Sequence, residues 1–206
     1  MSRYSKHQEQ ISEWKPRTTL GSLVLEGKIN SMEQVYENGM RIHEAEIVKH
    51  LIPDMKTQVV HVGIVQKQTD AGEMTRFDAL VAIGNEAGWF GLGKGKAAQM
   101  RIAIDKATNA AYLNVIPVKL GCGSWECRCS ELHSIPFKVR GKGGSVTIEI
   151  IPGPRGLGLV AGENIRNLLK LAGLKDAWTK SFGSTNTMMS TTKAVFSAIR
   201  STYIMG

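Results

Sequence analysis

The chain has 206 residues, of which 42% are apolar and 21% are charged, a composition that can bury a core and excludes a disordered tail or a coiled coil. No stretch approaches the roughly 20 uncharged apolar residues that cross a bilayer, and the first ten residues lack the apolar core of a signal peptide, so we expect a soluble, intracellular protein. The 26 Lys and Arg residues exceed the 18 Asp and Glu residues, and the resulting formal net charge of +8 favours a polyanionic partner.

Residues 1–53 are predicted to form a helical N-terminal extension. Ser31 and Gln34 have the spacing of a capping box, which starts a helix. The apolar residues that then recur at helical spacing before Pro53 are Ile42, Ala45, Val48 and Ile52. Because a single amphipathic stripe has to pack on another surface, we expect this extension to have no core of its own.

Residues 54–117 are predicted to form a small two-layer α/β domain. β-Branched and apolar runs at 59–65 and 77–83 indicate two antiparallel strands joined by a turn at 69–72, and a third strand begins at Trp89. A helix follows, and the apolar residues on its predicted buried face are Met100, Ile104, Ala107 and Ala111.

Residues 118–206 are predicted to form a second domain with the order strand, strand, helix, strand, helix. The first two strands cover 135–139 and 146–151, and the glycine-rich segment 140–144 is predicted to be the hairpin loop between them. A helical stripe over 165–172 ends at Gly173, which suits a left-handed C′ position. Asn186 or Thr187 is expected to cap the last helix.

The glycine-rich string 88–97 is the most distinctive local pattern. Because it is followed by a helix and contains no acidic residue, we expect it to form a loop at the helix N-terminus, where free N–H groups and the helix dipole attract a phosphate. A nucleotide phosphate is disfavoured, since Gly95 stands where a P-loop needs Ser or Thr, so a nucleic-acid backbone is the better match. The predicted contacts are the cations Lys94, Lys96 and Arg101, with Gly91, Gly93 and Gly95 letting the backbone approach.

Several motifs in this chain resemble those of one known family. The motifs are RFDALVAIG at 76–84, GLGKGKA at 91–97, PGPRGLGLVAG at 152–162, LAG at 171–173 and SFGSTN at 181–186. On these motifs the chain is identified as a member of the small-subunit ribosomal protein S-five (S5) family. The N-terminal extension and the segment His133–Val139 are similar to the archaeal and eukaryotic branch, and the compact size and the three cysteines favour archaea.

The resemblance implies an α+β fold, in which residues 54–117 form a double-stranded-RNA-binding-like domain and residues 118–206 an α/β domain with a left-handed βαβ crossover. It also implies a non-enzymatic constituent of the small ribosomal subunit that binds rRNA at the head–body junction, near the path along which mRNA enters. Its expected partners are the ribosomal proteins S-four, S-three and S-eight and the mRNA. Its expected roles are assembly, decoding accuracy and mRNA unwinding in the cytoplasm.

Two other functions stay open at this stage: a free double-stranded-RNA-binding regulator and a small-molecule phosphotransferase. The segment Pro154–Gly158 resembles the phosphate loop of certain kinases, but Leu159 and Val160 stand where those enzymes place hydroxyl residues. The second rank of predicted RNA contacts comprises Lys67, Arg140, Lys142 and Arg155; for the last three, solvated turn charge is an equally good interpretation. Lys67 is the weakest of these, because Asp70–Glu73 replaces the basic loop of bacterial members.

Three cysteines within eight positions do not form a disulfide framework. Together with a nearby histidine they supply three thiolates and an imidazole, a ligand set suited to tetrahedral zinc. The candidate ligands are Cys122, Cys127, Cys129 and His133. Buried or loop thiols without a metal are the alternative, because the Cys-x-Cys spacing is tighter than is common in zinc sites, and we expect no other cofactor.

Overall fold

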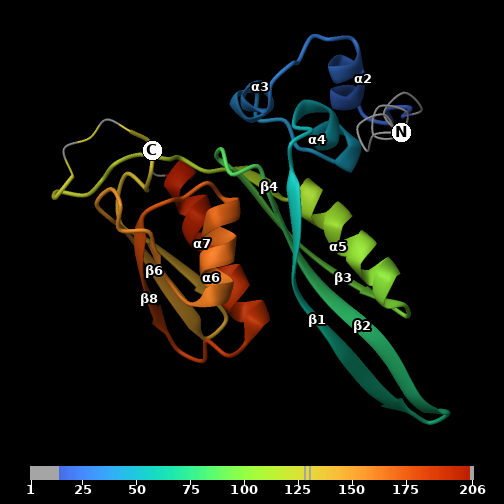
Figure 1. Ribbon diagram of the computed structural model, residues 1–206. Coiled ribbons are helices and arrows are strands. Elements are labelled where there is room, and N and C mark those ends of the chain that lie inside the picture. Colours follow the sequence, from blue (N-terminus) through green and yellow to red (C-terminus); the bar gives the residue numbers. More distant parts are fainter. Residues whose placement is uncertain (1–13, 128, 130, 205–206) are drawn as a thin grey trace, which may run out of the picture. The chain divides into compact units, whose positions relative to one another are not determined.

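The structure is a computed structural model that describes residues 14–127, 129 and 131–204 (Figure 1). In this part of the chain there are six helices and two four-stranded sheets, so the predicted α+β class is confirmed. The helices are α2 (Thr19–Leu25), α3 (Met32–Glu37), α4 (Ala45–Leu51), α5 (Met100–Leu113), α6 (Glu163–Leu171) and α7 (Met188–Ile204). The strands are β1 (Lys56–Thr69), β2 (Gly72–Gly84), β3 (Trp89–Ala97), β4 (Val115–Pro117), β5 (Val139–Gly143), β6 (Val146–Pro152), β7 (Leu159–Val160) and β8 (Ala177–Phe182).

The chain divides into two compact units, residues up to Met55 and residues from Lys56 onward. The first unit contains α2, α3 and α4, and the capping box is confirmed: Ser31 Oγ accepts from Gln34 N at 3.4 Å, and Gln34 Oε1 accepts from Asn30 N at 3.2 Å. Residues 1–13 of the predicted extension lie outside the described residues.

The expectation that this extension has no core of its own is wrong. Helix α2, which the sequence analysis missed, is capped by the Thr18 hydroxyl and supplies a second apolar stripe. The residues that form the resulting small core are Leu20, Val24, Ile29, Val35 and Ile47. Two apolar stripes can bury each other's side chains, whereas a single stripe needs another surface to pack on.

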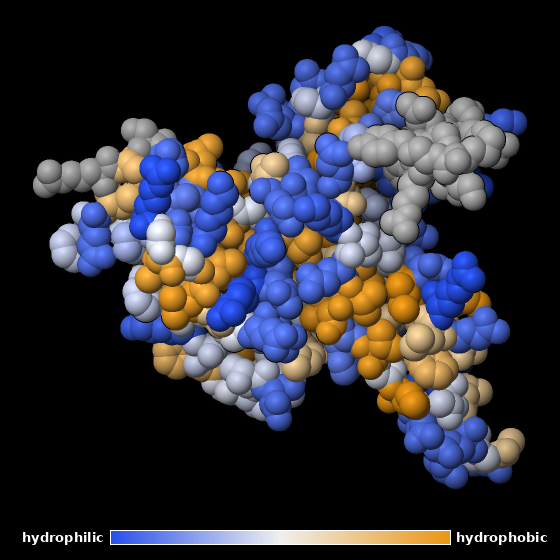
Figure 2. All heavy atoms as spheres, viewed as in Figure 1, coloured by the Kyte–Doolittle hydropathy of each residue, from blue (hydrophilic) through white to orange (hydrophobic). Residues whose placement is uncertain are grey.

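The first sheet of the second unit has the order β1-β2-β3-β4 and is antiparallel throughout. The three predicted strands are confirmed, and β1 and β2 are longer than expected. Their outer parts, residues 64–68 and 72–76, are exposed and form a hairpin that projects beyond α5 (Figure 1). Figure 2 shows that the tip of this hairpin carries mostly hydrophilic side chains.

Two segments predicted to be loops are strands, and both predictions are wrong for the same reason. The third strand, correctly predicted to begin at Trp89, continues through the glycine string that was expected to be a loop, and it pairs with β2 from Phe90 opposite Gly84 to Ala97 opposite Phe77. Residues 140–143 of the second segment pair with β6 as part of strand β5, and the turn follows at Gly144. Glycine disfavours strands in isolation, but here neighbouring strands supply the hydrogen bonds and a helix covers the glycine face.

The second sheet has the order β5-β6-β8-β7. The helix predicted at 165–172 and the last helix, predicted to follow a cap at Asn186 or Thr187, are confirmed as α6 and α7, and Gly173 has the left-handed φ of +94° expected of a C′ residue. The short strand β7 was not predicted. It runs parallel to β8, and α6 connects the two.

Both sheets share one hydrophobic core within the second unit. Phe90 of β3 packs against Phe196 of α7, with their ring centroids 6.1 Å apart. Leu171 O accepts a hydrogen bond of 3.0 Å from Glu86 N, in the turn after β2. A Cβ on Gly84 would lie 2.2 Å from the same carbonyl oxygen, so the end of α6 touches the backbone of the first sheet. No helix in the described ranges is long and apolar enough to span a membrane.

Candidate functional site

Lys94 and Lys96 project from the same exposed face of β3 and converge on one carboxylate. Lys94 Nζ lies 3.0 Å and Lys96 Nζ 3.8 Å from Asp78 Oδ2 on the neighbouring strand β2. The Asp78 side chain is only 9% exposed, and its Oδ1 atom is buried with no hydrogen-bond partner among the described residues. Two ammonium groups therefore share one carboxylate, which leaves one positive charge uncompensated at this point of the sheet.

The three glycines of this string lie on the opposite face of β3, under α5. A Cβ on Gly93 would be 2.0 Å from Ala107 O, and a Cβ on Gly95 would be 2.4 Å from Ala103 O. Gly91 stands in the same relation to Ala111 O, at 2.6 Å. Glycines facing alanines let the helix axis approach the sheet closely, and this packing explains them without an RNA contact. Since α5 covers this face, a phosphate can reach β3 only from the lysine face or from the edge.

Met100 was predicted to lie on the buried face of α5, but it is exposed. The face that packs on the sheet consists of the alanines at every fourth position, starting with Ala103. Arg101 is exposed in the first turn of the helix. Gln99 occupies the N-cap position and makes no side-chain capping hydrogen bond, so the first N–H groups of α5 have no side-chain acceptor there.

The same arrangement recurs on the second sheet. Arg140 and Lys142 project from the exposed face of β5, while Gly141 and Gly143 lie against α7. A Cβ on Gly141 would be 2.1 Å from the carbonyl oxygen of residue 194. On the exposed face the neighbouring strand again supplies one carboxylate, Glu149, which faces Arg140 in register.

Glu149 is the counterpart of Asp78 on the second sheet. Its Oε2 atom lies 2.8 Å from Lys138 Nζ, and its Oε1 atom lies 3.9 Å from Arg140 Nε. The hydrogen bond from Lys138 holds the pKa of Glu149 below its ordinary value, and the charges of Lys138, Arg140 and Lys180 act in the same direction. On both sheets, basic residues therefore surround a partly shielded carboxylate.

The sequence analysis missed three residues of strand β8 that share this exposed face. Lys180 faces Glu149, and Trp178 and Phe182 lie two residues away on either side. The two aromatic side chains are 44% and 51% exposed. The signal was available in the sequence, because residues 178, 180 and 182 alternate along a strand. Exposed aromatic side chains beside cations on a sheet suit the stacking of RNA bases.

The remaining predicted cations lie elsewhere. Lys67 is exposed on the projecting hairpin, opposite Met74. Arg155 lies in the loop after β6, and its Nη1 atom is 3.0 Å from Glu131 Oε1. The structure thus distributes the predicted contacts over both sheets, the hairpin and this loop.

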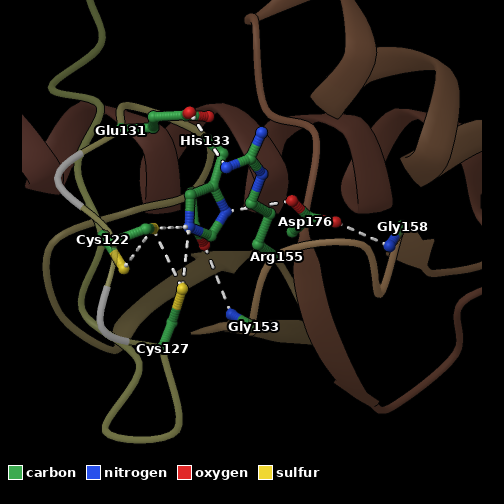
Figure 3. A network of polar contacts seen from close by, with 10 residues as sticks. Cys122, Cys127, Glu131, His133, Gly153, Arg155, Gly158 and Asp176 are labelled. Carbon is green, nitrogen blue, oxygen red and sulfur yellow. Dashed lines mark hydrogen bonds and ion pairs between the residues drawn. The ribbon is translucent and has the colours of Figure 1, made fainter.

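The four predicted metal ligands come together (Figure 3). Their ligand atoms all lie within 4.8 Å of one another, and the three cysteines are free thiols. Cys129 Sγ is 3.0 Å from Cys127 Sγ, 3.5 Å from Cys122 Sγ and 3.2 Å from His133 Nε2. The side chains of this cluster are half-buried, except that of the histidine, which is buried.

The sulfur atoms of the cluster differ in acidity. The hydrogen bond with the Cys129 thiol lowers the pKa of Cys127 to about 6, and the backbone N–H groups of Arg155 and Cys129 contribute. Burial raises the pKa of Cys122 to about 11, and its hydrogen bonds with the other two thiols add to the rise. The hydrogen bonds to Cys127 thus favour its thiolate, the form that binds metals.

Comparison with known proteins gives two family matches. The family model for ribosomal protein S5, N-terminal domain, matches residues 55–119. The model for ribosomal protein S5, C-terminal domain, matches residues 141–205. The two matches fall on the first and second sheets with their helices.

Curated relatives match over nearly the whole chain. The small ribosomal subunit protein uS5 of Cenarchaeum symbiosum is 63% identical over 193 residues, which cover 94% of this chain and 88% of that protein. The protein of the same name from Thermofilum pendens is 54% identical, covering 93% of this chain and 95% of its own length. That of Pyrobaculum aerophilum is 52% identical, with 94% and 88% covered. All three sources are archaeal.

Proposed function

The chain belongs to the ribosomal protein S5 family, and we infer that it is a structural, non-enzymatic constituent of the small ribosomal subunit that binds rRNA. The observation that carries this conclusion is 63% identity to a small-subunit protein over 94% of the chain. The sheet geometry supports it, because each sheet carries exposed cations, Lys94 and Lys96 on β3 and Arg140 and Lys142 on β5. Such a surface neutralises phosphates without a catalytic group.

The same proposal includes the location of the protein in the ribosome, its neighbours and its roles there. We place the protein in cytoplasmic ribosomes, at the head–body junction near the path along which mRNA enters, beside the proteins S-four, S-three and S-eight. There it would support assembly, decoding accuracy and mRNA unwinding. We propose no catalytic cofactor for this role.

The domain organisation is likewise proposed as residues 1–53, 54–117 and 118–206. The order β1-β2-β3-α5 supports a double-stranded-RNA-binding-like first domain. The parallel pair β7 and β8, connected through α6, supports a βαβ crossover in the second, which we propose to be left-handed.

Within this interface, Lys94, Lys96 and Arg101 are proposed to contact phosphates, with the open first turn of α5 adding N–H donors. Gly91, Gly93 and Gly95 contribute by bringing α5, which carries Arg101, close to strand β3. Lys67, Arg140, Lys142 and Arg155 form the second rank of contacts.

A phosphotransferase is disfavoured by the loop that resembles a kinase phosphate loop. Gly153 N donates to Ser134 Oγ at 3.3 Å, and Gly158 N donates to Asp176 Oδ1 at 2.7 Å. These N–H groups already have protein acceptors, so they do not point at an open phosphate site. Asp176 would also repel a phosphate from this place.

The test compares rRNA binding by wild-type protein and by a Lys94→Ala/Lys96→Ala variant across a series of salt concentrations, with transcribed small-subunit rRNA. The variant should bind more weakly, and the slope of log K against log salt should fall by about one for each lost phosphate contact. The matched control is Lys56→Ala, which removes a lysine of the same sheet that is also paired with one carboxylate, Glu86, at 2.8 Å.

If the slope of log K against log salt were unchanged in the double variant, these lysines would not contact rRNA phosphates. Sedimentation of a cell extract tests the broader function, because a subunit constituent stays with the small-subunit peak at moderate salt. A free double-stranded-RNA-binding regulator would leave that peak, and its release would overturn the ribosomal assignment.

A further inference from the structure

The Cys122–His133 segment and the loop at Gly153–Gly158 are linked by several polar contacts (Figure 3). One link runs through the segment itself, where the guanidinium of Arg155 pairs with Glu131, and another reaches the next residue, where Ser134 Oγ accepts from Gly153 N. A third link reaches the sulfur cluster directly, because the backbone N–H of Arg155 donates to the Cys127 sulfur. The loop and the cluster therefore hold each other in place.

The geometry of the cluster is that of a metal site. A tetrahedral zinc ion with Zn–S bonds of about 2.3 Å and a Zn–N bond of about 2.0 Å separates its ligand atoms by about 3.5–3.8 Å. The distances between Cys129 Sγ and the other three ligand atoms run from 3.0 to 3.5 Å, and Cys127 Sγ lies 3.7 Å from His133 Nε2. A small adjustment would place all four atoms around one ion. Three thiolates and one imidazole are a ligand set of structural zinc sites.

The groups behind the ligands also fit a metal. Backbone N–H groups donate to two of the sulfurs: Ser124 to Cys122, and Cys129 and Arg155 to Cys127. Such bonds orient a sulfur ligand and stabilise its negative charge.

The histidine has the buried carboxylate partner that metal-bound imidazoles commonly have. His133 Nε2 faces the sulfurs, while Nδ1 lies 3.0 Å from Asp176 Oδ2, close to the carboxylate but without a hydrogen bond to it. Both side chains are buried. The other oxygen of Asp176 accepts the N–H of Gly158 at 2.7 Å, at the far end of the loop. A chain of contacts therefore runs from the cluster through His133 and Asp176 to Gly158.

We propose that Cys122, Cys127, Cys129 and His133 bind one structural zinc ion, and that this ion fixes the Gly153–Gly158 loop through Cys127 at one side and through His133 and Asp176 at the other. The zinc thereby sets the position of Arg155, one of the cations proposed to contact rRNA. Asp176 is a positioning residue in this arrangement, since it acts on the metal only through His133. The metal-binding part goes beyond the proposed function and does not depend on it.

The first experiment measures metal in full-length protein that is purified without chelators and without a metal-affinity column. We expect one equivalent of zinc per chain, and we expect replacement by Co²⁺ to give the visible absorption of tetrahedral cobalt bound to thiolates. Trp125→Ala is the matched control, because Trp125 lies between the ligands in the sequence but is 91% exposed. This variant should retain the zinc. Far less than one equivalent, in protein both as purified and after incubation with zinc, would overturn the proposal, as would iron in its place.

The second experiment tests the role of Asp176 on the free protein. Asp176→Asn keeps the shape of the side chain and removes its charge, so we expect zinc to be retained with an affinity lowered by about 10–100-fold, measured by competition with a chelator. Unchanged zinc affinity in Asp176→Asn would show that Asp176 does not support the metal site.

Amide hydrogen exchange tests the fixing of the loop. Removal of zinc should speed exchange at Gly153, Arg155 and Gly158 and leave the buried part of β2 unchanged. Equal exchange rates at these residues with and without zinc would show that the metal does not fix the loop. None of these measurements uses RNA, so their failure is distinct from a failure of the proposed ribosomal function.

Discussion

Replacement of Gly93 by alanine tests whether the glycines of strand β3 serve packing. The new Cβ would lie 2.0 Å from Ala107 O and 2.2 Å from Ala111 N, whereas real Cβ contacts do not fall below 3.0 Å, so α5 has to move by at least about 1 Å. Both atoms belong to the helix backbone and cannot turn away as a side chain would. A gap of this size along the alanine face of α5 forfeits part of its dispersion contacts.

Overpacking of this kind costs about 2–3 kcal/mol, near the upper end of the usual range because the obstacle is backbone. For a chain of this length, that corresponds to a fall in Tm of roughly 4–12 °C. The assay is urea and thermal unfolding of the free protein, followed by circular dichroism. The matched control is Gly63→Ala on β1 of the same sheet, whose Cβ meets only the ring of His61, at 3.1 Å. Because that exposed ring can rotate, we expect the control to change stability by less than about 1 kcal/mol.

A Gly93→Ala protein as stable as the Gly63→Ala control would refute the packing argument. If such a protein also lost rRNA binding, the glycines would serve the approach of a phosphate, as the sequence analysis first expected.

The other predictions concern the two shielded carboxylates. Asp78→Asn removes the counter-charge of Lys94 and Lys96, so we expect this variant to bind rRNA more tightly than wild type at low salt. In a protein that lacks both lysines, the same substitution should give no gain in affinity. Equal affinity of Asp78→Asn and wild type for rRNA would contradict this reasoning. Because hydrogen bonding to Lys138 lowers the folded-state pKa of Glu149, this carboxylate stabilises the fold above its ordinary pKa, and the contribution disappears as the pH falls through the lowered value. Urea unfolding should therefore find Glu149→Gln less stable than wild type at neutral pH but equally stable in acid, whereas a difference that persists in acid would count against the ion pair.

Much of the architecture follows from local patterns in the sequence. The period of two in β1 and β2 and the helical spacing before Gly173 predicted their elements correctly, because burial on one face leaves a regular trace along the chain. The capping box at Ser31 was equally local. The short helix α2 and the two-residue strand β7 were missed, since neither is long enough to show a period.

The same distinction applies to the candidate site, where some residues could be identified from the sequence and others only from the folded structure. The residue types of the metal cluster lie close together in the sequence, so the four ligands could be named in advance. Asp176 could not, because only the pairing of β6 with β8 and the contact between Asp176 N and His133 O bring it behind the histidine. Likewise, the cations were evident from the sequence, but the carboxylates beneath them depend on strand register.

The sequence by itself determined the α+β class, the family, the positive charge and the set of possible metal ligands, all of which depend on residue type and short-range spacing. The tertiary structure decided which face each residue occupies. Gly93 carries no side chain that could reveal whether a phosphate or a helix approaches it. That choice depends on the alanines of α5 and on the pairing of β3 with β2, and such contacts between distant parts of the chain exist only once the chain has folded.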